Sequence, residues 1–221
     1  MRKLLFLTLG MAFLTGMKAQ ELSVGLDFYN RYVFRGVDFG NSPSLQPTIE
    51  FTSGNFTLGA WGAYSTGNGT TNGGFGEADL YTSYAFDFGL SLGATSYYYP
   101  GSSWFELDEG VSSHAIELNL GYEVSNFSFG ANYIVNDSRD GAGAEGGDMY
   151  FELGYGAGAF DLFLGAGDGW HTTNGNFQVV NVGIGTSKDI QITETFAIPM
   201  SGAVILNPNS EQLHLVVGVS F

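Results

Sequence analysis

Alternation with a period of two is the feature that most constrains how this chain can fold. Apolar and polar residues alternate in segments of about ten residues, which are separated by clusters of Gly, Asn, Asp, Ser and Pro. In the clearest segment Ile116, Leu118 and Leu120 alternate with Glu117 and Asn119. Successive side chains of a strand point to opposite faces, so this segment offers one face to hydrocarbon and the other to water. Repeated along a chain, the pattern is typical of a transmembrane β-barrel.

The same test along the whole sequence predicts an all-β fold, an antiparallel up-and-down barrel of about twelve strands. An even number suits a bacterial barrel whose two ends lie on the periplasmic side, and ten or fourteen strands also fit. The segment containing Pro199 is the weakest strand, because proline cannot donate to a ladder. The predicted strands are 22–35, 44–52, 56–64, 77–86, 88–98, 116–124, 127–135, 149–155, 160–166, 177–186, 196–206 and 213–221.

The connecting segments alternate in length. Short ones, such as 53–55 and 125–126, alternate with long ones, such as 65–76, 99–113 and 136–148. Short periplasmic turns and long outer loops are what an outer-membrane barrel predicts. A soluble sandwich or barrel is the alternative. Nearly uncharged outward faces, aromatic residues near strand ends and a final Phe221 favour the membrane.

The first residues are typical of a targeting signal rather than of part of the fold. Arg2 and Lys3 precede an apolar run, and the segment 15–19 offers a cleavage region before Gln20. We therefore expect a signal peptide at 1–19, a barrel domain at 20–221 and location in the cell outer membrane. The alternating C-terminal strand that ends in Phe221 is the pattern recognised by barrel-assembly machinery, which we expect as a partner.

Charge and composition narrow the possible partners. The chain has 7 basic and 22 acidic residues. Removal of Arg2, Lys3 and Lys18 leaves 7 − 3 = 4 basic residues, so the mature charge is 4 − 22 = −18. This balance disfavours nucleic acid as a partner. Cysteine is absent, which excludes disulfides and thiolate metal sites.

The start of the mature chain resembles the TorF-family porins, also called the Gcw_chp group, in the stretches VGLDFYNRYVFRGVDFGNSPSLQPTIEF and GNFTLGAWGAYS. Asn30 and Arg31 stand where the family more often has Ser-Asp. The resemblance implies an outer-membrane barrel that forms a pore, with no established substrate. The matching residues are Tyr32, Val33, Phe34, Arg35, Gly36, Pro43, Leu45, Gln46, Gly59, Ala60 and Trp61.

Alternation also selects the side chains expected to line the lumen. Rings of carboxylates favour cations, so we expect a constricted, cation-preferring channel for passive diffusion of small hydrophilic solutes. An equally weighted alternative is a lumen plugged by ion pairs, in which Arg31 and Arg35 bridge neighbouring carboxylates. The pore-lining candidates are Asp27, Arg31, Glu50, Trp61, Glu77, Asp79, Tyr81, Glu117, Glu123 and Glu152.

A non-transporting structural or surface-binding barrel is the second functional candidate. Its acidic outer loops would contact outer-membrane lipid and lipopolysaccharide. The segment 136–148 resembles a calcium loop, but Gly147 stands where the bidentate Glu should be, so we expect no metal and no cofactor.

Catalysis is the third candidate and the weakest. A barrel lipase needs a histidine with a nearby serine and a group that orients the histidine. Ser112, Ser113 and His114 are local candidates, but the flanking sequence offers no third member. We therefore expect no enzyme.

Overall fold

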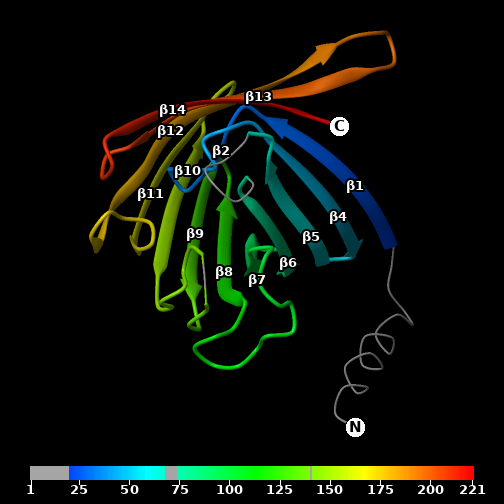
Figure 1. Ribbon diagram of the computed structural model, residues 1–221. Coiled ribbons are helices and arrows are strands. Elements are labelled where there is room, and N and C mark those ends of the chain that lie inside the picture. The colour runs from blue at the N-terminus through cyan, green and yellow to red at the C-terminus, as the bar shows by residue number, and fades with distance from the viewer. Residues whose placement is uncertain (1–19, 68–73, 140) are drawn as a thin grey trace.

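The computed structural model describes residues 20–67, 74–139 and 141–221. The predicted signal peptide, 1–19, lies outside the described residues. Twelve antiparallel strands form a closed barrel (Figure 1), as predicted. Among the described residues, no helix is long and apolar enough to cross a membrane.

The first and last strands close the barrel. β1 (Gln20–Tyr29) pairs along its whole length with β4 (Ser44–Ser53) and, through its last residues, with β14 (Gln212–Ser220). The other neighbours follow sequence order. They are β5 (Phe56–Ser65), β6 (Gly76–Ala85), β7 (Leu90–Tyr98), β8 (His114–Val124), β9 (Phe127–Ile134), β10 (Met149–Gly156), β11 (Asp161–Gly169), β12 (Gly175–Gln191) and β13 (Ala197–Asn207).

The wall of the barrel has the two faces that alternation predicts. On β1, Leu22 and Val24 are 70% and 75% exposed. On β8, Leu118 is half exposed, whereas its neighbour Glu117 is buried. An apolar outer face on a closed barrel is typical of a barrel whose wall contacts lipid.

Pro199 is accommodated at the end of a ladder. It lies in β13 opposite Asp189 of β12. The pairing of β13 with β14 begins one residue later, at Met200 and Val219. Residue 199 therefore does not have to donate a backbone hydrogen bond to β14. Proline is tolerated here because it has no N–H group to donate.

The predicted first strand, 22–35, is wrong at its C-terminal end. β1 stops at Tyr29, and a separate two-stranded hairpin follows, formed by β2 (Tyr32–Phe34) and β3 (Val37–Phe39). Its turn residues Arg35 and Gly36 have φ angles of 51° and 80°. Two positive φ angles in a two-residue loop are those of a type I′ turn, in which Arg35 takes the place usually held by Asn or Asp.

Aromatic packing holds this hairpin inside the barrel. The ring centroid of Tyr32 lies 5.4 Å from that of Trp61, and the ring centroid of Phe34 lies 6.1 Å from that of Trp170. Burial of each such side chain contributes about 1.5–3 kcal/mol. A cavity between Phe34, Phe39 and the wall has a volume of about 10 Å³, room for roughly one water molecule. The hairpin therefore fills the half of the lumen nearest the long loops.

Candidate functional site

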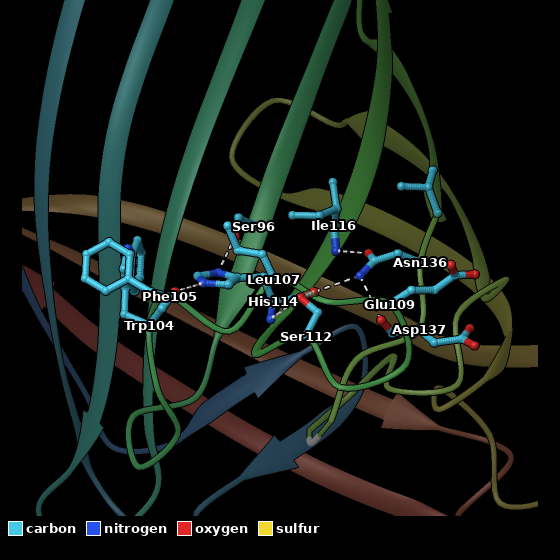
Figure 2. Close-up of a pocket in the computed structure, with 11 residues that line it drawn as sticks. Ser96, Trp104, Phe105, Leu107, Glu109, Ser112, His114, Ile116, Asn136 and Asp137 are labelled. Carbon is cyan, nitrogen blue, oxygen red and sulfur yellow. Dashed lines mark hydrogen bonds between the residues drawn. The ribbon is translucent and has the colours of Figure 1, made fainter. Parts of the chain in front are cut away.

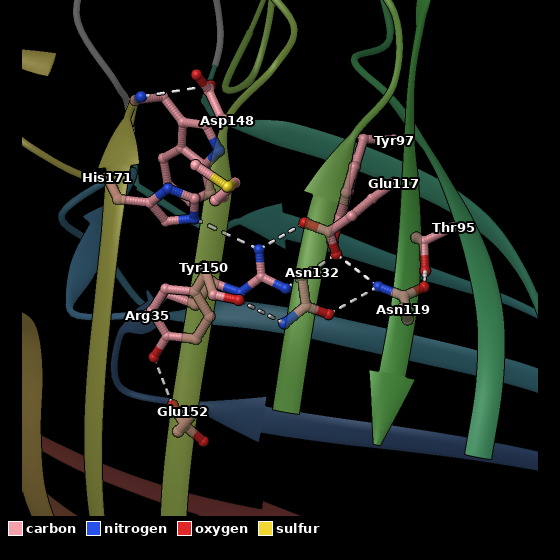
Figure 3. A network of polar contacts seen from close by, with 12 residues as sticks. Arg35, Thr95, Tyr97, Glu117, Asn119, Asn132, Asp148, Tyr150, Glu152 and His171 are labelled. Atoms are coloured by element: carbon pink, nitrogen blue, oxygen red, sulfur yellow. Dashed lines mark hydrogen bonds and ion pairs between the residues drawn. The ribbon is translucent and has the colours of Figure 1, made fainter. Parts of the chain in front are cut away.

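The tip of the hairpin forms an ion pair with the opposite wall. Arg35 reaches Glu117 of β8 with two hydrogen bonds, Nη1 to Oε2 at 2.6 Å and Nη2 to Oε1 at 2.9 Å (Figure 3). The two side chains are only 9% and 2% exposed. A bidentate guanidinium–carboxylate pair fixes position as well as charge. We call this pair the latch.

Neighbouring polar groups satisfy the carboxylate of the latch. Tyr97 donates its hydroxyl to Glu117 Oε1 at 3.0 Å, and Asn119 donates its side-chain amide to the same oxygen at 2.6 Å. Asn119 in turn accepts from Thr95 and donates to Asn132. Buried charges are tolerated when they are paired and fully hydrogen-bonded, and Glu117 meets both conditions.

The guanidinium is enclosed on its other sides. Its Cζ lies 4.5 Å from the ring centroid of Tyr150 and 4.6 Å from that of Phe34. Burial opposes the charge of Arg35, but the hydrogen bonds and charge of Glu117 outweigh burial and raise the pKa of Arg35. The hairpin tip therefore carries a permanent positive charge.

His171 completes the surroundings of Arg35. Its Nδ1–H donates to the carbonyl oxygen of Asp168 at 2.8 Å, which leaves Nε2 as an acceptor 3.4 Å from Arg35 Nη1. Burial and the charge of Arg35 lower the pKa of His171 to about 3. His171 is therefore neutral in the folded protein at ordinary pH.

Gly36 brings the hairpin tip against two further strands. Its carbonyl oxygen accepts a hydrogen bond from Asn207 of β13 at 3.1 Å. A Cβ atom at this position would lie 2.0 Å from the carbonyl oxygen of Val180 in β12. Both the close approach and the positive φ require glycine here.

The lumen is more open on the other side of the latch. A cavity of about 420 Å³ lies beside Arg35 and reaches toward the short turns along Asn132, Gly130 and Glu152. The lumen thus has a packed half near the long loops and a more open, polar half near the short turns.

The structure brings part of the predicted lumen set to the hairpin. Trp61 packs on Tyr32 and Glu117 forms the latch. Glu77 and Asp79 are buried, at 2% and 6% exposure, and each keeps one carboxylate oxygen without a hydrogen-bond partner among the described residues.

Five other predicted residues form no hydrogen bond with the hairpin among the described residues. Tyr81 donates to Glu50 at 2.8 Å, and Asn181 donates to Glu152 at 3.0 Å. Asp27 alternates with exposed neighbours on β1, and Glu123 is exposed near the short-turn end of β8. That these side chains line a conducting pore stays a prediction.

The prediction for Arg31 on the first barrel strand is wrong. Arg31 lies between β1 and β2 and pairs with Asp38 within the same connection. Sequence reasoning also missed partners of the latch, because each lies far from Arg35 in the sequence and none has a local motif. They are Tyr97, Asn119, Tyr150, His171 and Asn207.

Comparison with solved structures finds other barrels at low identity. An engineered variant of the porin from Rhodopseudomonas blastica shares 16% identity with a TM-score of 0.41, over 80% of this chain. The chain spans 55% of the length of that porin. The Salmonella typhi outer membrane phospholipase, solved as a calcium-bound dimer, shares 13% identity with a TM-score of 0.40, over 89% of this chain and 87% of that one.

Comparison with protein families is decisive, although no curated protein matches the chain. The model of a family described as "Bacterial protein of unknown function (Gcw_chp)" matches residues 15–200, which include the hairpin, the latch and most of the barrel. The chain therefore belongs to the Gcw_chp family.

Proposed function

We propose that this protein is a TorF-type porin of the outer membrane, which admits small hydrophilic solutes by passive diffusion, and that the β2–β3 hairpin sets its permeability. The observation that carries the proposal is a closed barrel, apolar outside and polar inside, crossed by one hairpin whose tip is held by the latch. Diffusion through a lumen needs no covalent chemistry. Lumen side chains decide what passes.

The lumen charge supports a preference for cations. Arg31 and Arg35 are each paired with a carboxylate, Asp38 and Glu117. Glu50 and Glu152 have hydroxyl and amide donors as partners instead, which leave their negative charge in place. A cation entering the short-turn half of the lumen is attracted to these carboxylates, and an anion is repelled.

The packing around Tyr32 and Phe34 favours a second candidate, a barrel that does not transport. The cavity between Phe34, Phe39 and the wall has a volume of only about 10 Å³ among the described residues, too little for a hydrated solute while the latch is closed. Such a barrel would act at the envelope surface, where its acidic loops meet lipopolysaccharide and outer-membrane lipid. In both cases we expect the barrel-assembly machinery to act on the C-terminal strand.

Single-channel conductance separates the two candidates. The chain from Gln20 onward is refolded, inserted into a planar bilayer and compared with Glu117→Gln, which breaks the latch without a change of shape. Glu123→Gln, on the same strand but exposed near the short turns, is the control.

The porin predicts small steps for the native protein, larger or more frequent openings for Glu117→Gln, and the native frequency of openings for Glu123→Gln, which leaves the latch intact. If native protein and Glu117→Gln are both folded and silent, the barrel does not transport.

A further inference from the structure

A third cavity lies on the outer wall of the barrel. The connection between β7 and β8, residues 99–113, folds against the outward face and lines an open cavity of about 760 Å³ (Figure 2). Ser96, His114 and Ile116 line it from the strands, and Trp104 and Leu107 line it from the connection. These strand positions alternate outward together with the exposed Leu92 and Leu118. The cavity therefore opens on the face that we assign to lipid.

A serine and a histidine are hydrogen-bonded in this cavity. Ser96 Oγ lies 3.0 Å from His114 Nδ1, and His114 Nε2 lies 2.8 Å from the carbonyl oxygen of Trp104 (Figure 2). A carbonyl oxygen can only accept, so Nε2 carries a proton. In a neutral ring Nδ1 then has a free lone pair and accepts the Ser96 proton. This is the tautomer that a general base next to a serine nucleophile needs.

The imidazole is held on several sides. Its centroid lies 4.6 Å from the Trp104 ring at an angle of 88° and 5.4 Å from the stacked Tyr98 ring. The main chain of His114 is held as well, since its N–H donates to Ser112 Oγ at 3.1 Å and its carbonyl accepts from Asn136 at 2.9 Å. The base is therefore oriented before any substrate binds.

We propose that Ser96 and His114 form an esterase site for acyl esters presented by the membrane. Ser96 Oγ attacks the ester carbonyl carbon while His114 Nδ1 takes the hydroxyl proton. The bond from that carbon to the alcohol oxygen then breaks, and the leaving alcohol takes the proton from His114. Water, activated by His114 in the same way, hydrolyses the acyl-serine and restores Ser96.

The lining of the cavity indicates the substrate class. Phe105, Leu107 and Val135 offer apolar surface for an acyl chain, whereas Glu109 and Asp137 place acidic groups in the same lining. Phe105 and Leu107 are 85% and 69% exposed, as expected of side chains that enter a lipid interface. The site fits an ester with an aliphatic acyl chain and a neutral or cationic alcohol part.

The sequence had suggested a different serine for this chemistry. Ser112 is bonded to the main chain of His114 rather than to its ring, and Ser113 Oγ is buried without a hydrogen-bond partner among the described residues. The hydroxyl that is hydrogen-bonded to the His114 ring belongs to Ser96, on the neighbouring strand. The group that orients the ring is the main-chain carbonyl of Trp104, which no sequence motif marks.

A covalent probe tests the assignment directly. The refolded barrel is treated in detergent with an alkyl fluorophosphonate, the modified peptide is identified by mass spectrometry, and hydrolysis of p-nitrophenyl dodecanoate is followed. The variants are Ser96→Ala, His114→Gln and the control Ser91→Ala, an inward position of the same strand. Folding of each is checked by heat-modifiable migration in gels.

We expect label on Ser96 in the native protein and in Ser91→Ala, and a loss of hydrolysis of about 100-fold or more in Ser96→Ala and His114→Gln. Absence of label on the native protein, or unchanged hydrolysis by Ser96→Ala, would overturn the proposal. If His114→Gln fails to fold, Ser96→Ala decides alone. The conductance of Ser96→Ala stays that of the native protein, so this test and that of the porin are independent.

Discussion

Arg35 illustrates how a single residue joins the hairpin to the wall of the barrel. Its charge is buried and has one anionic partner, Glu117, on a strand that is 82 residues away in sequence. Removal of one member of a buried ion pair leaves the other charge uncompensated, which typically costs about 3–5 kcal/mol, whereas removal of both costs less. The latch therefore couples the position of the hairpin to the stability of the barrel.

The first prediction concerns this coupling. We expect Glu117→Gln to lower the free energy of unfolding by about 3 kcal/mol and the double variant Arg35→Met/Glu117→Gln to recover part of the loss. Urea unfolding of the refolded barrel measures both, with Glu123→Gln as control. A double variant less stable than Glu117→Gln would show that packing rather than charge holds Arg35.

His171 predicts a dependence of stability on pH. Its pKa is about 3 in the folded protein and about 6.5 when unfolded, so between these values the unfolded state binds the extra proton. His171 does not lower the free energy of unfolding above about pH 6.5. As pH decreases from there toward 3, protonation of His171 in the unfolded state lowers that free energy by up to about 1.4 kcal/mol per pH unit.

The measurement is the unfolding midpoint of the native protein and of His171→Gln between pH 7 and pH 5. We expect the native midpoint to fall more steeply on acidification, because glutamine does not titrate. Parallel curves for the two proteins would contradict the neutral, buried histidine.

At the scale of elements, the barrel strands could be predicted from the sequence and the hairpin could not. Each strand is specified locally, since alternation decides which face meets lipid. The hairpin is specified by distant contacts, such as Glu117 and Asn207 with its tip. The only local indication of a hairpin was Gly36 at the second position of a two-residue turn. Arg35 at the first position is not the Asn or Asp that usually marks such a turn.

The hairpin turn supplies the third prediction. Gly36→Ala places a Cβ against the Val180 carbonyl oxygen, so the tip must withdraw from β12. Trp61 and Trp170 then lose their contacts with the hairpin and become more exposed to water, so tryptophan fluorescence emission shifts to longer wavelength. Gly54→Ala is the matched control: its φ is 58°, but nothing lies within 4 Å of the added atom. Equal shifts in both variants would assign the effect to backbone strain alone.

At the scale of the whole molecule, the two faces of the wall carry separate roles. The inner face holds carboxylates and the latch, whereas the outer face holds the apolar band and the cavity around Ser96. The sequence predicted this division, because alternation assigns every strand residue to one face. It could not predict that a connection would fold into the lumen or onto the wall, since connections have no such period.

The division predicts which carboxylates control ion selectivity. In a potassium chloride gradient we expect the native channel, or Glu117→Gln if the native channel opens rarely, to show a reversal potential on the cation-selective side. The double variant Glu50→Gln/Glu152→Gln of the same protein reduces this reversal potential, because both carboxylates face the lumen on the short-turn side of the latch. Glu109→Gln, in the lining of the outer cavity, is the control and leaves the potential unchanged. Since the Debye length is about 10 Å at 0.1 M salt, the difference shrinks as salt rises. A larger effect from Glu109→Gln than from the lumen pair would place the selective charge at the loops instead of within the barrel.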